Sequence, residues 1–204
     1  MKRAPIQLLL LIPIALLAFK QPGTKPQEYQ CLDCHSDLND KSFVHEVASE
    51  GCEFCHTATG KEHPGDEPGF TIESENICLD CHYFETDGVL SLHGPFIDGA
   101  CLDCHDAHQS EFMYLMKMET GKLCLFCHNK EIQTENKSIH SISKDLTEGN
   151  DIHEAVADGE CTTCHTGHTA VNHFLLLGKY PRSQYVKATE ENFEICFMCH
   201  DIVE

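Results

Sequence analysis

The pattern Cys-x-x-Cys-His occurs seven times along this chain and accounts for all 14 of its cysteines. Since no thiol is left over, the chain must fold around whatever the seven motifs bind. The motif cysteines are Cys31 and Cys34, Cys52 and Cys55, Cys78 and Cys81, Cys101 and Cys104, Cys124 and Cys127, Cys161 and Cys164, and Cys196 and Cys199. The histidines that close the motifs are His35, His56, His82, His105, His128, His165 and His200.

The spacing within each motif suits the covalent attachment of haem. Two thiols three positions apart can each add to one of the two vinyl groups of a haem, and the histidine that follows becomes the proximal ligand of the iron. We therefore predict seven covalently bound haem c groups. Structural zinc is one alternative, but it needs two Cys-x-x-Cys pairs per ion, and seven pairs is an odd number. A disulfide framework is another, and it leaves the histidines unexplained.

The N-terminal segment is typical of a secretory signal. Two basic residues precede a largely apolar run over residues 6–19, which is short for a membrane-spanning helix. We predict a signal peptide over residues 1–20. An uncleaved N-terminal anchor is the alternative, because Leu16 is a poor residue two positions before a cleavage after Ala18. Haem c is attached outside the cytoplasm, so we expect a periplasmic or extracellular protein.

The remaining residues, 21–204, are expected to form a single multihaem domain. They provide about 26 residues per motif, too few for a large side-chain core, so the haems should form the core. The expected fold class is short α-helices and extensive coil wrapped around a haem chain, with little or no β-structure. Longer helices are predicted near 111–117 and 189–199.

The motifs are arranged as a repeat. First motifs begin at Cys31, Cys78 and Cys124, and a second motif follows each of them, as expected for stacked structural units. A similar phrase precedes each second motif and contains His45, His93 or His153. The predicted units are 31–77, 78–123 and 124–195, followed by a terminal motif over 196–204.

Eight histidines lie outside the motifs, enough for a second axial ligand on each of seven irons. They are His45, His63, His93, His108, His140, His153, His168 and His173. A histidine three residues after a proximal one cannot easily reach the other face of the same haem, so His108 and His168 are expected to bind a neighbouring iron. Either His140 or His173 is expected to serve the seventh haem. Imidazole on both faces leaves no open position for substrate and favours a lower potential than methionine ligation.

The formal net charge of the chain is −19. Such a surface repels nucleic acid and anionic lipid and attracts basic partners, although charge of this size also serves plain solubility.

The paired motifs and recurring histidine phrases resemble those of the doubled Cys-x-x-Cys-His multihaem cytochromes c, a group that includes cytochrome c3-like and decahaem electron carriers. The resemblance covers roughly residues 29–202. It implies an electron carrier that does not turn over a substrate. We expect such a carrier to work between a membrane quinol-oxidising complex and a terminal reductase or outer-membrane conduit. An insertion over about 131–150 departs from the pattern. A multihaem reductase with one open haem and a subunit of a haem filament are the alternatives.

Overall fold

The computed structural model describes residues 31–134, 137–148, 151–183 and 185–201. The predicted signal peptide over 1–20 lies outside these ranges. No helix within them has the length and apolar character needed to cross a membrane. By their contacts, residues Cys31–Glu204 form one unit.

Each motif begins on a short helix, as predicted. Seven helices carry them: η1 (Cys31–Asp33), η3 (Cys52–Phe54), η4 (Ile77–Asp80), α3 (Cys101–Cys104), α4 (Thr120–His128), η6 (Cys161–Thr163) and α7 (Glu194–Phe197). In the motifs outside α4, the backbone N–H of the histidine donates to the carbonyl of the first cysteine at 2.9–3.0 Å. This one hydrogen-bonded turn brings both thiols and the imidazole together at one end of a short element.

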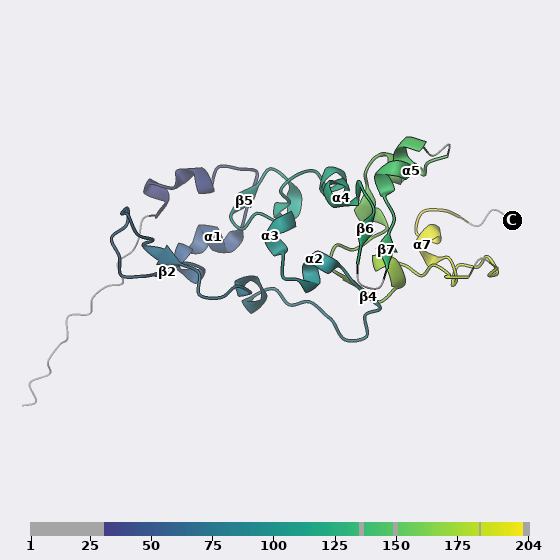
Figure 1. The fold of residues 1–204 in the computed structure, drawn as a ribbon, viewed down its shortest axis with the longest axis horizontal. Coiled ribbons are helices and arrows are strands. Elements are labelled where there is room, and N and C mark those ends of the chain that lie inside the picture. Colours follow the sequence, from purple (N-terminus) through teal and green to yellow (C-terminus); the bar gives the residue numbers. More distant parts are fainter. Residues whose placement is uncertain (1–30, 135–136, 149–150, 184, 202–204) are drawn as a thin grey trace, which may run out of the picture. The chain divides into compact units, whose positions relative to one another are not determined.

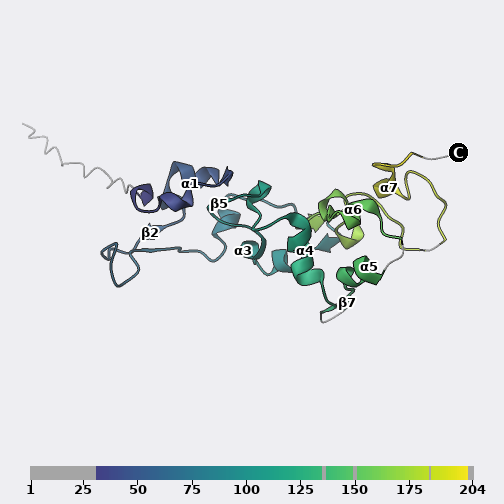
Figure 2. The same ribbon diagram turned by 90° about the horizontal axis from the view of Figure 1, so that it is seen from above.

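The eight strands of the described residues contain two residues each and form four antiparallel pairs. Two pairs join successive units of the repeat: β1 (Phe43–Val44) with β5 (Gln109–Ser110), and β4 (Ser91–Leu92) with β8 (Thr169–Ala170). Two are local: β2 (Thr57–Ala58) with β3 (Phe70–Thr71), and β6 (Ile132–Gln133) with β7 (Ser138–Ile139). Figures 1 and 2 show α1 beside β5 in both views, although they are far apart in the sequence.

The remaining helices are also short. Three of them, α1 (Glu46–Glu50), α2 (Gly94–Ile97) and α6 (Glu154–Ala157), begin immediately after the recurring histidines His45, His93 and His153. The others are η2 (Ser36–Leu38), η5 (Met113–Leu115), η7 (His173–Leu175) and α5 (Ile142–Glu148), the last of which belongs to the insertion in the third unit.

The prediction of a helix over Glu111–Lys117 is wrong. Only the single turn η5 forms there, because Tyr114 and Leu115 take left-handed backbone angles, with φ of 59° and 55°. Phe174 and Leu175 repeat this conformation in η7, with φ of 62° and 58°. The helix predicted over 189–199 is shorter than expected: a turn at Thr189, whose hydroxyl accepts the N–H of Asn192, precedes α7.

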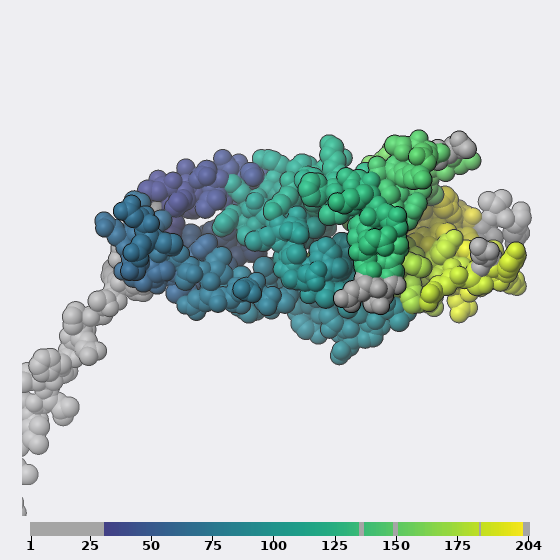
Figure 3. Space-filling view, viewed as in Figure 1, coloured from purple at the N-terminus to yellow at the C-terminus, as the bar shows by residue number. Residues whose placement is uncertain are grey.

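The described polypeptide has almost no side-chain core. Leu123 and Ala170 are its buried hydrophobic residues, while 23 large hydrophobic side chains are exposed. The space-filling view shows openings between the purple segment and the blue and teal segments (Figure 3). A chain with so little buried apolar surface cannot offset the entropy of its own folding, so a further apolar group must supply the core.

Candidate functional site

Six of the seven motif histidines lie beside one histidine from outside the motifs. The ring centroids in these pairs are 5.9–6.2 Å apart. The pairs, with the motif member first, are His35 and His63, His56 and His108, His82 and His45, His105 and His168, His128 and His93, and His200 and His153.

This separation fits one iron bound by both rings. A metal–imidazole bond is about 2.0 Å long and the ring centroid lies about 1.1 Å behind the nitrogen, so two imidazoles on opposite sides of one ion have centroids about 6.2 Å apart. Five pairs have ring planes within 11–23° of parallel. The planes of His153 and His200 cross at 89°. Imidazoles on one iron can adopt either orientation.

Backbone carbonyls fix the tautomer of several of these rings. Nδ1 of His45 donates to the carbonyl of Ala107 at 2.9 Å, and Nδ1 of His93 donates to that of Gly167 at 3.0 Å. Such a bond leaves Nε2 unprotonated and directed toward a metal.

Two motif histidines have the same support. Nδ1 of His105 and of His165 donates to the carbonyl of Tyr114 and of Phe174 respectively, each at 2.9 Å. The left-handed backbone at these two acceptors turns the carbonyls toward the rings. These supporting carbonyls were not among the groups predicted from the sequence.

The histidines from outside the motifs are called the outer histidines below. The two strand pairs that join units place outer histidines of neighbouring units side by side. His45 follows β1 and His108 precedes β5, and the N–H of His45 donates to the carbonyl of His108 at 2.7 Å. Their rings nevertheless pair with different motifs, His45 with His82 of the second unit and His108 with His56 of the first. Each unit therefore offers a histidine to its neighbour.

The second strand pair repeats this exchange. The N–H of His93 donates to the carbonyl of His168 at 2.9 Å, while the two rings lie beside His128 and His105 respectively. Neither His108 nor His168 lies beside the proximal histidine of its own motif, which is the arrangement that the spacing predicts.

Side chains around the outer histidines fix their positions. Backbone N–H groups of His108 and Gln109 donate to Asp106 Oδ1 at 2.9 and 3.1 Å, and the bond from His108 is the largest cause of the lowered pKa of Asp106. His168 packs against Phe84 and Phe96, with ring centroids 4.8 and 5.6 Å away. Burial lowers the pKa of His168, which favours the neutral imidazole that metals bind.

His63 is placed by the local hairpin of β2 and β3. Its ring meets Phe70 edge-on at 5.3 Å. A Cβ added to Gly69 would lie 2.5 Å from the Cβ of His63, so the backbone of the hairpin passes directly against this side chain. The hairpin thus holds His63 beside His35 within the first unit.

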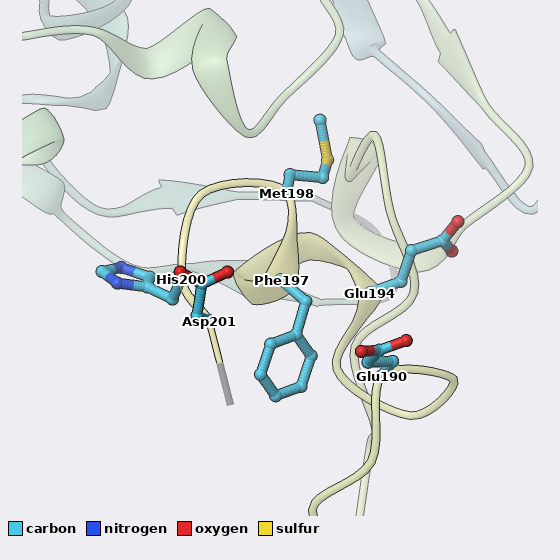
Figure 4. A pocket seen from close by; sticks show the side chains of 6 residues that line it. All are labelled: Glu190, Glu194, Phe197, Met198, His200 and Asp201. Atoms are coloured by element: carbon cyan, nitrogen blue, oxygen red, sulfur yellow. The ribbon is translucent and has the colours of Figure 1, made fainter. Parts of the chain in front are cut away.

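The last motif borders a hollow of about 340 Å³, lined by Glu190, Glu194, Phe197, Met198, His200 and Asp201 (Figure 4). The imidazole of His200 points away from the two glutamates in this view. The side chain of Met198 points in another direction than His200.

The motifs of each unit lie next to one another. Burial raises the pKa of Cys124 to about 12, and the neighbouring thiol of Cys161 adds to the shift. Burial likewise raises the pKa of Cys52, and the thiol of Cys31 adds to the shift. Burial also raises the pKa of Cys78, and the thiol of Cys101 adds to that shift. The first cysteines of the two motifs in a unit are thus within electrostatic reach of each other.

Neither alternative reading of the cysteines matches this arrangement. All 14 lie in the described part of the chain, and none forms a disulfide. Within the described ranges, no group of three or more His, Cys, Asp or Glu side chains could hold a bare metal ion, whereas structural zinc needs four ligands around one point. Two imidazoles beside two thiols fit a covalently held haem.

Three histidines take no part in the six pairs. His140 Nε2 bonds Asp145 Oδ1 at 2.9 Å, and its side chain is 63% exposed. His173 lies on η7 at 6.2 Å from Phe174. The structure brings neither of them beside His165, the one motif histidine outside the six pairs.

Comparison with known families gives one match. Residues 93–133 and 153–203 match the family model described as "Doubled CXXCH motif". No curated protein and no solved structure matches the chain.

Proposed function

We propose that this chain, of which residues 93–133 and 153–203 match the doubled CXXCH motif family, is an exported electron relay with seven haem c groups. The family supports covalent haem and electron transfer. When bound, the haem irons supply reversible one-electron oxidation and reduction. The number of haems, the export and the partners are our proposals.

The observation that carries the proposal is the set of six histidine pairs. Every pair combines one motif histidine with one histidine from outside the motifs, at 5.9–6.2 Å. Two imidazoles per iron keep it low-spin and leave no position for substrate, which suits a carrier.

The order of the sites supports a continuous path. Burial is the largest cause of the raised pKa of Cys78 and of Cys104. Among the smaller causes, Cys55 raises the pKa of Cys78 and Cys127 raises that of Cys104, so these thiols of neighbouring units are also within electrostatic reach. Successive motifs from the first to the sixth are therefore neighbours. Exchange of histidines between units then ties each site to the next, so that their relative positions do not depend on flexible linkers.

The charge suggests the nature of the partners. With a formal net charge of −19, the surface attracts redox proteins through basic docking patches and repels nucleic acid. We propose a membrane quinol-oxidising complex as donor and a terminal reductase or outer-membrane conduit as acceptor.

Haem quantification combined with electron paramagnetic resonance tests the proposal. The purified holoprotein should contain seven haems per chain, and at least six irons should give low-spin signals. Substantially fewer haems, or mainly high-spin iron, would refute it.

A further inference from the structure

The sixth motif differs from the other six in its axial surroundings. Its histidine, His165, has the same Nδ1 bond to a left-handed residue as His105 and therefore presents Nε2 in the same way. All 15 histidines of the chain lie in the described residues, and within them no second imidazole ring pairs with His165.

His173 is on the wrong side to serve this iron. It occupies the position of Met113 in the repeat, since both begin the turn whose next residue accepts the Nδ1 bond of the proximal histidine. That turn lies on the Nδ1 side of the proximal ring, whereas an iron would be bound on the opposite side, at Nε2. In the equivalent site, the iron of His105 faces His168 from the next unit.

His140 is held by its own segment. The Nε2–H group of His140, the atom that would bind an iron, donates to Asp145 Oδ1 at 2.9 Å, and the ring is mostly exposed. The insertion that carries it has no counterpart in the other two units, so the repeat assigns it no iron.

The strand exchange shows which ligand is missing. β1 precedes His45 and pairs with β5, which follows His108 of the next unit. β4 precedes His93 and pairs with β8, which follows His168 of the next unit. The matching position in the third unit is Asp151–Ile152, directly before His153, and in the described residues no strand pairs with it. In both observed pairs, the histidine before the second strand lies beside the second motif histidine of the preceding unit. A strand that paired with Asp151–Ile152 in the same way would therefore place its preceding histidine beside His165.

We infer that the iron held by His165 has an axial position open to a small exogenous ligand, such as carbon monoxide, nitric oxide or cyanide. This inference rests on the proposed function and adds a ligand-binding site to the relay. The other six irons, each between two imidazoles, are closed to such ligands.

Carbon monoxide titration of the reduced holoprotein, followed by absorbance, tests the inference. We expect one adduct per seven haems in the parent protein. The variants His140→Ala and His173→Ala should also form one adduct, because neither side chain binds iron. The positive control His63→Ala should form two.

Three outcomes would overturn the inference. The parent protein could form no adduct while His140→Ala or His173→Ala forms one, which would identify that residue as the seventh ligand. The parent protein, His140→Ala and His173→Ala could all fail to form a carbon monoxide adduct. The parent protein could also lose its adduct as the protein self-associates at high concentration, in which case a second copy supplies the ligand. Failure of the proposed function looks different, because it would give several carbon monoxide adducts or fewer than seven haems in the parent protein.

Discussion

The substitution Gly69→Ala should release His63 from its iron without replacing any ligand residue. The new Cβ would lie 2.5 Å from the Cβ of His63 and 3.1 Å from its Cγ. Non-bonded carbon atoms approach to about 3.5 Å, so one of the two residues must move by about 1 Å. A metal–imidazole bond of about 2.0 Å does not survive an extension of that size. The ring of His63 should therefore dissociate.

The matched control is Gly94→Ala. Gly94 also neighbours an outer histidine, His93, but a Cβ there has no heavy atom within 4 Å. Compared with the parent protein, Gly69→Ala should gain one high-spin iron and one carbon monoxide adduct, while Gly94→Ala should gain neither. Added imidazole should restore the low-spin signal of Gly69→Ala.

The haem content separates loss of a ligand from loss of a fold. Both variants should keep the parent number of haems, because Gly69 is not part of a motif. The reasoning is refuted if Gly69→Ala keeps all its haems and gains no high-spin iron, since the hairpin would then have absorbed the clash without moving His63.

Three further predictions follow from the same geometry. In His108→Ala, one additional carbon monoxide adduct should form at the second motif; it should disappear when Cys52 and Cys55 are also changed to Ser and persist when Cys101 and Cys104 are changed instead. In Gly121→Ala, the new Cβ would lie 2.8 Å from the carbonyl of Gly159, so the holoprotein should lose about 1–3 kcal/mol of stability in urea unfolding, whereas Gly167→Ala, with nothing within 4 Å, should lose none. Protein made without haem attachment should show no cooperative thermal transition by circular dichroism, because its described residues bury little more than Leu123 and Ala170.

The sequence was most informative where chemistry fixes local geometry. Cys-x-x-Cys-His demands one helical turn, and the structure forms that turn at each motif. The recurrence of His45, His93 and His153 before second motifs also predicted comparable positions, and each is followed by a short helix. Spacing further predicted that His108 and His168 would lie beside foreign motifs.

The sequence was least informative where long-range exchange decides the outcome. Two-residue strands such as β1 and β5 are too short to leave an alternating pattern, so the pairing of residues 65 and 67 positions apart could not be predicted from the sequence. A helix was also predicted from Glu111 to Lys117. The requirement that the carbonyl of Tyr114 reach His105 overrides the local helix propensity.

The exchange rule also explains why the two ends of the array differ. Each strand pair between units supplies two outer histidines, so the two pairs serve four irons, and His153 lies beside a fifth proximal histidine, His200. The irons of His35 and His165 then lie outside the exchange, because neither strand pair between units in the described residues places a histidine beside His35 or His165. The β2–β3 hairpin resolves the first case by placing His63 within the same unit. No comparable hairpin in the described residues places a histidine beside His165. Because neither a strand pair nor a hairpin supplies this iron with a second imidazole, it is the iron that can accept a ligand from solution.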